Sequence, residues 1–341
     1  MFSNEKNIDK LFLNWLIISL ILVFLIIIVG GLTRLTNSGL SITEWELFKG
    51  VLPPLNEKTW FTYFDKYKEI PQFKLLNPDM TLDEFKIIFY WEYFHRVLAR
   101  IIGLFFLIPL IIFYFTKKIK SEHLNISFCV MALIILQGFI GWVMVKSGLI
   151  NNTTVSHYRL SIHLTTALII VSTIFWLILN IVSSNNKLFF KISNNNLPFQ
   201  FFILLIFIQI IIGAFVSGLD AGKIYQTWPL MGNSYVPNDL TIENTNQILN
   251  FDNHSLVQFY HRNLAYLIIT YVLFLSIYIF KKKIISLYRP LKILILFIFL
   301  QVFLGIFTLI SGLNIFLASA HQITSVLLIL SALNLYYLRA K

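Results

Sequence analysis

Four histidines lie inside long apolar runs of the sequence, where polar side chains are rare. They occur in the segments WEYFHRVLAR, RLSIHLTTAL, VQFYHRNLAY and LASAHQITSV, as His95, His163, His261 and His321. Polar groups placed in a hydrocarbon layer are costly and generally mark a function. A single histidine of this kind is more often structural, but four of them, paired by an internal repeat, favour ligands to a bound group.

Paired histidines suit haem iron better than an isolated metal ion. A zinc or copper site needs a third or fourth Cys, His or carboxylate ligand close by. A haem iron needs only two axial ligands from the protein, because the macrocycle supplies the other four. The sequence therefore predicts two haem sites, one in each half of the chain, each held by two histidines from facing helices.

A carboxylate accompanies one of the two repeated histidine segments, and an amide accompanies the other. Glu92 lies three residues before His95, and Gln258 lies three residues before His261. This spacing puts each polar residue on the same helix face as its histidine. Only the first site would then hold a group able to carry a proton or stabilise a cation, so Glu92 is the candidate catalytic residue. A structural Glu92, hydrogen-bonded to a neighbouring helix, is the alternative.

Two arginines each follow one of these histidines directly. Arg96 and Arg262 lie about 100° around the helix axis from the preceding histidine. At a wet edge of the membrane they could pair with haem propionates, since arginine binds carboxylates through parallel hydrogen bonds. Snorkelling to lipid headgroups is the competing role. The remaining histidines, His123, His157 and His254, lie at the edges of apolar runs or between them and are expected to be solvated.

The elements that carry these residues are membrane-spanning helices. Of the 341 residues 57% are hydrophobic and 13% charged, which leaves too few polar residues to cover a water-soluble protein of this size. A single cysteine, Cys129, excludes an internal disulfide and is expected to pack as a small apolar residue. A helix needs about 20 apolar residues to cross the hydrocarbon. Eight such runs predict an all-α integral membrane protein with transmembrane helices at approximately 11–30, 87–115, 124–145, 160–182, 198–218, 257–280, 291–312 and 316–338.

The distribution of charge predicts the orientation of the chain in the bilayer. Basic residues concentrate at both ends and in the short connections, and they account for most of the net charge of +11. The two long connections are slightly acidic: residues 31–86 carry seven basic and eight acidic side chains, and residues 219–256 carry one and four. By the positive-inside rule both termini are cytoplasmic, and the four histidines lie toward the outer, periplasmic face. This placing of the charge argues against a nucleic-acid partner.

The two halves of the chain resemble each other. LQGFIGWVMVKSGL (136–149) matches LQVFLGIFTLISGL (300–313), and each half contributes four helices. Because four is an even number, both halves have the same orientation, and we expect two four-helix bundles related by a pseudo-twofold axis along the membrane normal. The predicted domains are residues 1–183 and 184–341. The long connections after the first and fifth helices are expected to be lids or binding elements.

Longer motifs extend over nearly the whole chain. They are GGLTRLTNSGLSITEW (30–45), PPL (53–55), DEFKIIFYWEYFHR (83–96), RLSIHL (159–164), GLDAGKIYQTWPLM (218–231), FYHRNLAY (259–266) and HQ (321–322). With these motifs the sequence resembles the haem A synthases, in their alphaproteobacterial and mitochondrial form. That family consists of eight-helix membrane enzymes that oxidise a methyl substituent of haem O to the formyl group of haem A, for the terminal oxidase.

The resemblance implies a role for each half of the chain. The first half would bind the substrate haem O through His95 and His163. The second half would keep a haem b cofactor through His261 and His321, and Glu92 would match the family's essential glutamate. The implied location is the cell inner membrane, with haem O synthase and a membrane electron acceptor as partners, while homo-oligomerisation stays open. Some bacterial members carry a cysteine pair in the first outer loop, and this sequence lacks it.

Two other functions would use a similar arrangement. A di-haem b-type cytochrome acting only in electron transfer would use the same histidines, although the difference between Glu92 and Gln258 argues mildly against it. A transporter would also have duplicated halves, but it should have broken helices with polar residues at the membrane midplane. In this sequence the polar cluster lies near the predicted outer face.

Overall fold

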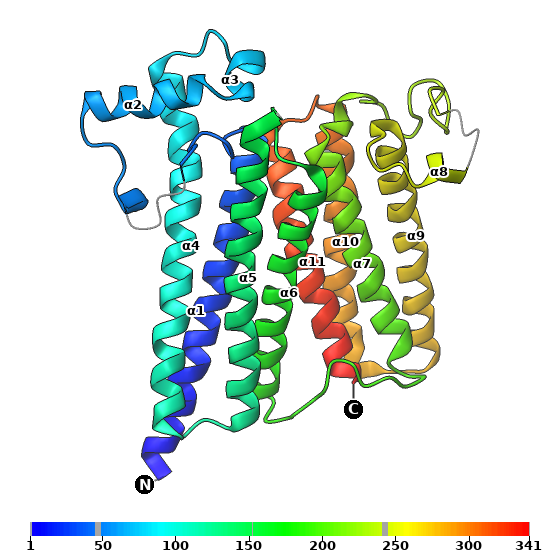
Figure 1. The fold of residues 1–341 in the computed structure, drawn as a ribbon. Helices are drawn as coiled ribbons and strands as arrows, with labels where there is room; N and C mark the ends of the chain where they lie inside the picture. The colour runs from blue at the N-terminus through cyan, green and yellow to red at the C-terminus, as the bar shows by residue number, and fades with distance from the viewer. Residues whose placement is uncertain (1, 45–48, 152, 241–244, 341) are drawn as a thin grey trace. The chain divides into compact units, whose positions relative to one another are not determined.

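The fold is known from a computed structural model that describes residues 2–44, 49–151, 153–240 and 245–340. Within these residues it is helical, apart from turns, loops and one isolated bridge between Met231 and Ser234. Eight helices are long and apolar enough to cross a membrane, which confirms the predicted fold class and number of spans (Figure 1). They are α1 (Phe2–Leu35), α4 (Leu82–Thr116), α5 (Ser121–Asn151), α6 (His157–Val182), α7 (Leu197–Gly218), α9 (His254–Lys281), α10 (Tyr288–Ile310) and α11 (Ile315–Arg339).

Polar caps extend α4 beyond the apolar run that predicts it. The Thr81 hydroxyl accepts from the Glu84 N–H, and the Glu84 carboxylate accepts from the Thr81 N–H, which together form a capping box. At the other end, Lys117 adopts the left-handed conformation (φ 53°) that commonly terminates a helix. The long helix therefore continues past the hydrocarbon and carries Glu92 and His95 well inside its N-terminal half.

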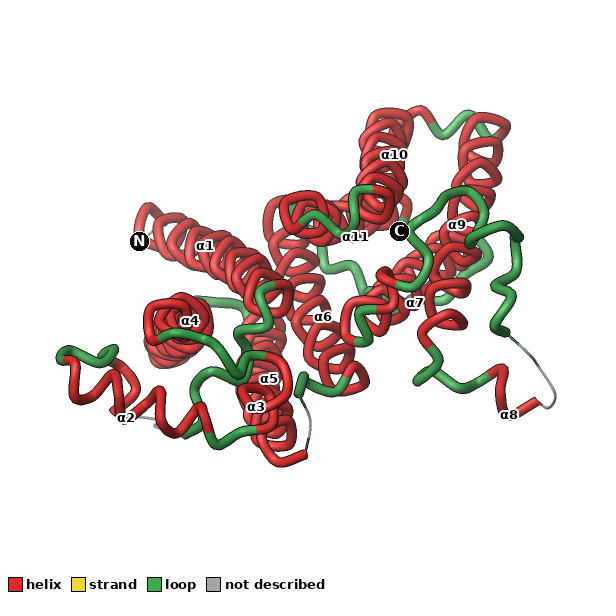
Figure 2. Tube along the Cα trace, turned by 90° about the horizontal axis from the view of Figure 1, so that it is seen from above, coloured by secondary structure: helices red, strands yellow, loops and turns green. Residues whose placement is uncertain are grey.

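The chain forms two compact units, Met1–Ile174 and Phe175–Lys341. In the first unit α4 packs against both α1 and α5. In the second unit α9 and α11 each pack against both α7 and α10, so that the four helices form a closed bundle (Figure 2). The division falls within α6 rather than at the predicted boundary after residue 183. The assignment of separate haem-binding roles to residues 1–183 and 184–341 stays a prediction.

The described parts of the first connecting segment, residues 36–44 and 49–81, are folded rather than extended. They contain α2 (Glu57–Lys68), α3 (Pro71–Leu76) and a short 3-10 turn, η1 (Lys49–Val51), and α2 packs against α4 (Figure 1). The Asn56 side chain caps α2 by accepting from the Thr59 N–H. A buried hydrophobic cluster fixes the segment on α4; its members are Leu40, Ile42, Trp60, Phe64, Tyr67, Ile70, Phe85, Ile88 and Phe89.

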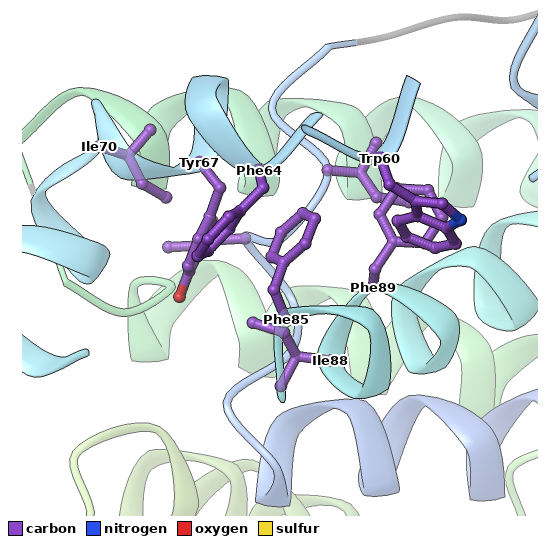
Figure 3. Close-up of a cluster of buried hydrophobic side chains, with 9 residues drawn as sticks. Trp60, Phe64, Tyr67, Ile70, Phe85, Ile88 and Phe89 are labelled. Atoms are coloured by element: carbon purple, nitrogen blue, oxygen red, sulfur yellow. The ribbon is translucent and has the colours of Figure 1, made fainter. Parts of the chain in front are cut away.

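Aromatic contacts dominate this cluster. Figure 3 shows the Trp60 ring beside Phe89, and their ring centres are 5.0 Å apart at a steep angle. The Phe85 ring lies 5.1 Å from the rings of both Phe64 and Tyr67. Edge and tilted contacts of this kind are the favoured arrangements of aromatic pairs. The connecting segment is therefore anchored to α4 directly N-terminal to Glu92.

The second connecting segment, residues 219–253, contains the 3-10 turn η2 (Ala221–Lys223) and the short helix α8 (Thr245–Ile248). Its Asp239 carboxylate accepts from the Tyr225 hydroxyl at 2.5 Å and from the Ser255 hydroxyl of α9 at 2.6 Å. Burial raises the pKa of Asp239, but the hydrogen bonds from Ser255 and Tyr225 outweigh it, so this pKa lies below its usual value. These bonds attach the segment to the start of the helix that carries His261.

Of four single residues considered in the sequence, the structure describes Cys129, His157 and His254. Cys129 is exposed on α5, so it is not the packed residue expected. His157 is buried rather than solvated, and its ring packs on Tyr158 with ring centres 4.1 Å apart. His254 is exposed as expected. Trp45, part of a motif cited for the resemblance, lies outside the described residues.

Candidate functional site

The structure brings the predicted histidine pairs together. In the first unit His95 of α4 faces His163 of α6, with ring centres 6.5 Å apart and 48° between the ring planes. In the second unit His261 of α9 faces His321 of α11, with ring centres 6.4 Å apart and 78° between the planes. Each unit therefore holds one pair of opposed imidazoles.

The spacing within each pair fits a single metal atom between the rings. An imidazole nitrogen binds a metal at about 2.0 Å and lies about 1.1 Å from its ring centre, so two opposed ligands hold their ring centres about 6.2 Å apart. The observed separations of 6.5 and 6.4 Å are close to this value. Among the described residues no group of three or more His, Cys, Asp or Glu side chains could hold a bare metal ion. The donor set fits a haem iron, which takes two ligands from the protein.

Each histidine ring packs on a glycine of the preceding long helix. A Cβ atom added to these glycines would lie between 2.8 and 3.1 Å from Cε1 of the facing ring, closer than ordinary van der Waals contact. In every ring Cε1 lies nearest the added Cβ, followed by Nδ1 and then by Nε2 at 3.8–4.0 Å. The absence of a side chain thus makes the room that each ring occupies. The pairs are Gly30 with His95, Gly141 with His163, Gly213 with His261 and Gly305 with His321.

Glutamines hold the main chain of three of the four histidines. The Nε2 atom of Gln137 donates to the carbonyl oxygen of His163 at 2.9 Å. In the second unit Gln209 donates to the His261 carbonyl at 3.0 Å. Gln301 donates to the His321 carbonyl at 2.8 Å. Each glutamine lies four residues before the glycine of its helix, and the residue at that position before Gly30 is Ile26.

The sequence contains a pattern that could have revealed these partners. The segments LIIIVG (25–30), LQGFIG (136–141), IQIIIG (208–213) and LQVFLG (300–305) each end on a glycine that contacts a histidine. Two of them lie in the repeated segments 136–149 and 300–313. Sequence spacing shows which residues share a helix face, but it does not show which other helix that face contacts.

Glu92 is buried, with 3% of its surface exposed, and its carboxylate accepts four hydrogen bonds. The Ser41 hydroxyl and the Ile42 N–H donate to Oε2, both at 2.8 Å. Nε and Nη2 of Arg96 donate to Oε1 at 3.0 and 2.5 Å. This is a buried ion pair that also attaches the first connecting segment to α4. The donors lie in the connecting segment and on α4 itself rather than on a neighbouring helix, and the catalytic role of Glu92 stays a prediction.

The charge of Glu92 affects the pKa of Tyr67, a member of the buried hydrophobic cluster that holds the first connecting segment on α4. The Tyr67 hydroxyl donates to Gln72 at 3.1 Å and accepts from Asn77 at 2.8 Å, and Gln72 in turn donates to the Asn37 carbonyl at 3.0 Å. Burial raises the pKa of Tyr67, the hydrogen bond from Asn77 opposes this rise, and the negative charge of Glu92 adds to it. Tyr67 is therefore a neutral, fully hydrogen-bonded phenol that connects both ends of the segment.

The corresponding residues of the second unit use an amide instead of a carboxylate. Nε2 of Gln258 donates to the Tyr225 carbonyl at 2.8 Å, and Arg262 donates to the same carbonyl at 3.0 Å. Arg262 also donates to the Leu230 carbonyl at 3.3 Å. Gln258 thus repeats the attachment of a connecting segment without a negative charge. The two units thus differ here in charge and in hydrogen bonding, and the predicted difference in chemistry stays a prediction.

A cavity of about 220 Å³ lies beside Arg96 in the first unit. Arg96 also donates to the carbonyls of Ile42 at 2.9 Å and Glu44 at 3.2 Å. The lining contains the basic side chains of Arg96 and Lys146 and the acidic side chain of Glu44, and Arg96 is itself paired with Glu92. Contact of Arg96 or Arg262 with a propionate stays a prediction, because both guanidinium groups bind loop carbonyls here. The cavity is lined by Ile42, Thr43, Glu44, Arg96, Trp142, Val145, Lys146 and Leu149.

Comparison of the whole chain with known families places these features in context. The family model of the cytochrome oxidase assembly proteins, COX15-CtaA, matches residues 13–333, which include every histidine, glycine and glutamine described above. The chain belongs to this family. The match runs through both units and is not restricted to one histidine pair.

Curated relatives from the family are similar over almost their full length. A protein of Pelagibacter ubique (strain HTCC1062) is 48% identical over 340 residues, covering 99% of both chains. A protein of Wolbachia pipientis wMel is 42% identical over 327 residues, covering 95% of this chain and 92% of its own. A protein of Flavobacterium johnsoniae is 39% identical over 336 residues, covering 95% and 96%. All three are named Heme A synthase.

Proposed function

We propose that this protein is a haem A synthase, which oxidises a methyl group of haem O to the formyl group of haem A for a terminal cytochrome oxidase. The observation that carries the proposal is the pair of opposed imidazole sites, of which only one has a buried carboxylate three residues before a ligand histidine. Relatives named Heme A synthase, 39–48% identical over at least 95% of this chain, support it. The protein would act in the cell inner membrane, with both sites toward the periplasmic side.

The two histidine pairs would hold different haems. His95 and His163 would bind the substrate haem O, because Glu92 and the Arg96 cavity accompany them. His261 and His321 would bind a resident haem b, whose chemistry when bound is one-electron transfer. This assignment gives the first half of the chain the substrate and the second half the cofactor.

Arg96 connects substrate binding to Glu92. We infer that a haem O propionate enters the cavity lined by Arg96 and Lys146 and takes over hydrogen bonds that Arg96 gives to Glu92. Glu92 would keep the hydrogen bonds from Ser41 and Ile42 and would present one free carboxylate oxygen near the substrate. A negative group held in this way stabilises positive charge that develops on the methyl carbon as electrons leave it.

The overall reaction needs an oxidant. Each of two steps removes two electrons and two protons and adds one water, giving first the alcohol and then a gem-diol. Loss of one water from the gem-diol gives the aldehyde. The four electrons pass to an electron acceptor in the membrane, and haem O synthase would supply the substrate.

Pigment analysis tests the proposal. The purified protein is supplied with haem O and an oxidant, and the bound haems are extracted and separated by chromatography. We expect haem b together with haem A formed from haem O. Two permanent b haems and unchanged haem O would identify an electron-transfer cytochrome and would overturn the proposal.

A further inference from the structure

We propose that three glutamines position three of the four ligand histidines, and that the fourth, His95, is the ligand that yields when haem enters or leaves the first site. The glutamines are Gln137, Gln209 and Gln301, and Ile26 takes the corresponding place before Gly30. The inference rests on the proposed function, since it requires both histidine pairs to bind haem.

Each glutamine and its glycine act on the same histidine from one helix face. Residues four apart on a helix lie one turn apart on the same side. The glutamine holds the histidine's carbonyl, as Gln209 does for His261 at 3.0 Å, while the glycine receives the ring. Gln209 Nε2 also lies 3.2 Å from the Nδ1 atom of His261. A carbonyl oxygen has a second lone pair, so this bond adds to the helical one without replacing it. Two contacts one turn apart fix the register of one helix against the other.

His95 lacks the first of these two contacts. Ile26 has no donor, so the Gly30 contact is what locates the ring from α1. Two side chains of α1 donate to carbonyls of α4. The Thr33 hydroxyl donates to the Trp91 carbonyl, N-terminal to His95, at a long 3.4 Å, and the Trp15 ring N–H donates to the Phe105 carbonyl, C-terminal to His95, at 3.1 Å. Neither bond reaches the carbonyl of His95 itself. The Gly30 contact, at 2.8 Å from an added Cβ to Cε1, limits the room for the ring but does not hold the main chain of His95.

The distribution of the glutamines matches the demands on the two sites. The second site keeps its cofactor, and both of its histidines are held by a glutamine. The first site must accept a substrate and release a product, and there only His163 has its carbonyl held by a glutamine. Since a haem held by two histidines leaves only after both axial bonds have broken, the histidine whose main chain is not held by a glutamine would be the first to let go. His163 would retain the iron while His95 moves away.

Haem release rates test this inference. Wild type, I26Q, Q209L and Q301L are loaded with haem O and haem b, apomyoglobin is added in excess, and each released haem is identified by chromatography. One neutral hydrogen bond changes an equilibrium constant by about threefold to tenfold. We expect I26Q to slow haem O release by about that factor, and Q209L and Q301L to accelerate haem b release and to shift the low-spin electron paramagnetic resonance signal of haem b.

Gln200 provides a matched control on the same helix as Gln209. Its Nε2 atom donates to the Tyr336 hydroxyl at 2.7 Å and to the Phe189 carbonyl at 3.0 Å, away from the histidines. Q200L should leave haem release and the resonance signal unchanged. Unchanged haem O release in I26Q would overturn the role of His95, and unchanged haem b release and signal in Q209L and Q301L would overturn the role of the glutamines. Release is measurable without turnover, so protein that binds both haems without forming haem A overturns the proposed function alone.

Discussion

Arg96 binds Glu92 through two hydrogen bonds, four residues along α4, while Ser41 and Ile42 of the first connecting segment donate to the other carboxylate oxygen. One carboxylate, three residues before His95, thus attaches the connecting segment and compensates the largely buried guanidinium of Arg96. A buried charge is tolerated when it is paired and fully hydrogen-bonded in this way. Any change at Glu92 therefore affects both the charge of the site and the position of the segment.

Glu92→Gln is expected to keep both haems but to stop the oxidation. Glutamine is what the second unit has at Gln258, so the side chain fits a helix of this kind. It has no charge, and loss of one electrostatic contact of this type lowers kcat by about 100-fold to 1000-fold. The measurement is the rate of haem A formation together with the haem content. Full activity in this variant would contradict the catalytic role.

Ser41→Ala separates the two contributions of Glu92. The variant removes one donor to Oε2 but leaves the charge of Glu92 and its pairing with Arg96. Loss of a single hydrogen bond to a charged group costs about 1.5–3 kcal/mol of folding free energy at most. If the attachment of the segment were all that mattered, Ser41→Ala and Glu92→Gln would lower activity by similar factors.

His261→Ala is expected to remove the resident haem b specifically. An axial ligand is lost on one side of the iron, while the His95 and His163 pair is in the other compact unit and is unchanged. Extraction of the pigments should show haem b reduced and haem O binding retained, and His95→Ala should show the reverse. Unchanged haem b after His261→Ala would show that the halves are assigned wrongly.

The helices and the histidine pairs were predictable because a bilayer restricts what a chain can do. A spanning segment must satisfy its backbone hydrogen bonds internally, so apolar length alone predicts helices. Within such runs a polar residue is rare enough that His95, His163, His261 and His321 are identified by type and position. Their pairing followed from one histidine on each alternate helix and from the repeat.

The contacts around the histidines were not predictable, because they depend on which helix faces meet. Gly213 and Gln209 read as ordinary residues of an apolar run, although one contacts the His261 ring and the other its carbonyl. The length of the first connecting segment indicated a lid, but its burial of Trp60 and Tyr67 on α4 depends on tertiary packing. For the same reason the exposure of Cys129 was not predictable, because its residue type does not show which side of α5 contacts other helices.

The attachment of the second connecting segment is expected to depend on pH through Asp239. Its folded pKa is lowered, chiefly because the hydrogen bonds from Ser255 and Tyr225 outweigh the effect of burial. The stabilisation is therefore present above the unfolded pKa of about 3.9 and is lost as the pH falls through the folded value. Limited proteolysis of residues 219–253 should accelerate at low pH. Ser255→Ala should move the onset of this acceleration to higher pH, and an unchanged onset would contradict the assignment.

Gly141→Ala and Gly138→Ala form a matched pair on α5. A Cβ at Gly141 would lie 3.1 Å from Cε1 of His163, so the ring must move, whereas nothing lies within 4 Å of a Cβ at Gly138. Overpacking of this kind costs about 1–3 kcal/mol, and we expect Gly141→Ala to weaken haem binding at the first site accordingly. Gly138→Ala should bind haem normally and gain about 0.5–1 kcal/mol of helix stability. Haem titration followed by Soret absorbance distinguishes the two, and equal losses would show that α5 is sensitive to any added methyl group rather than to the position of the His163 ring.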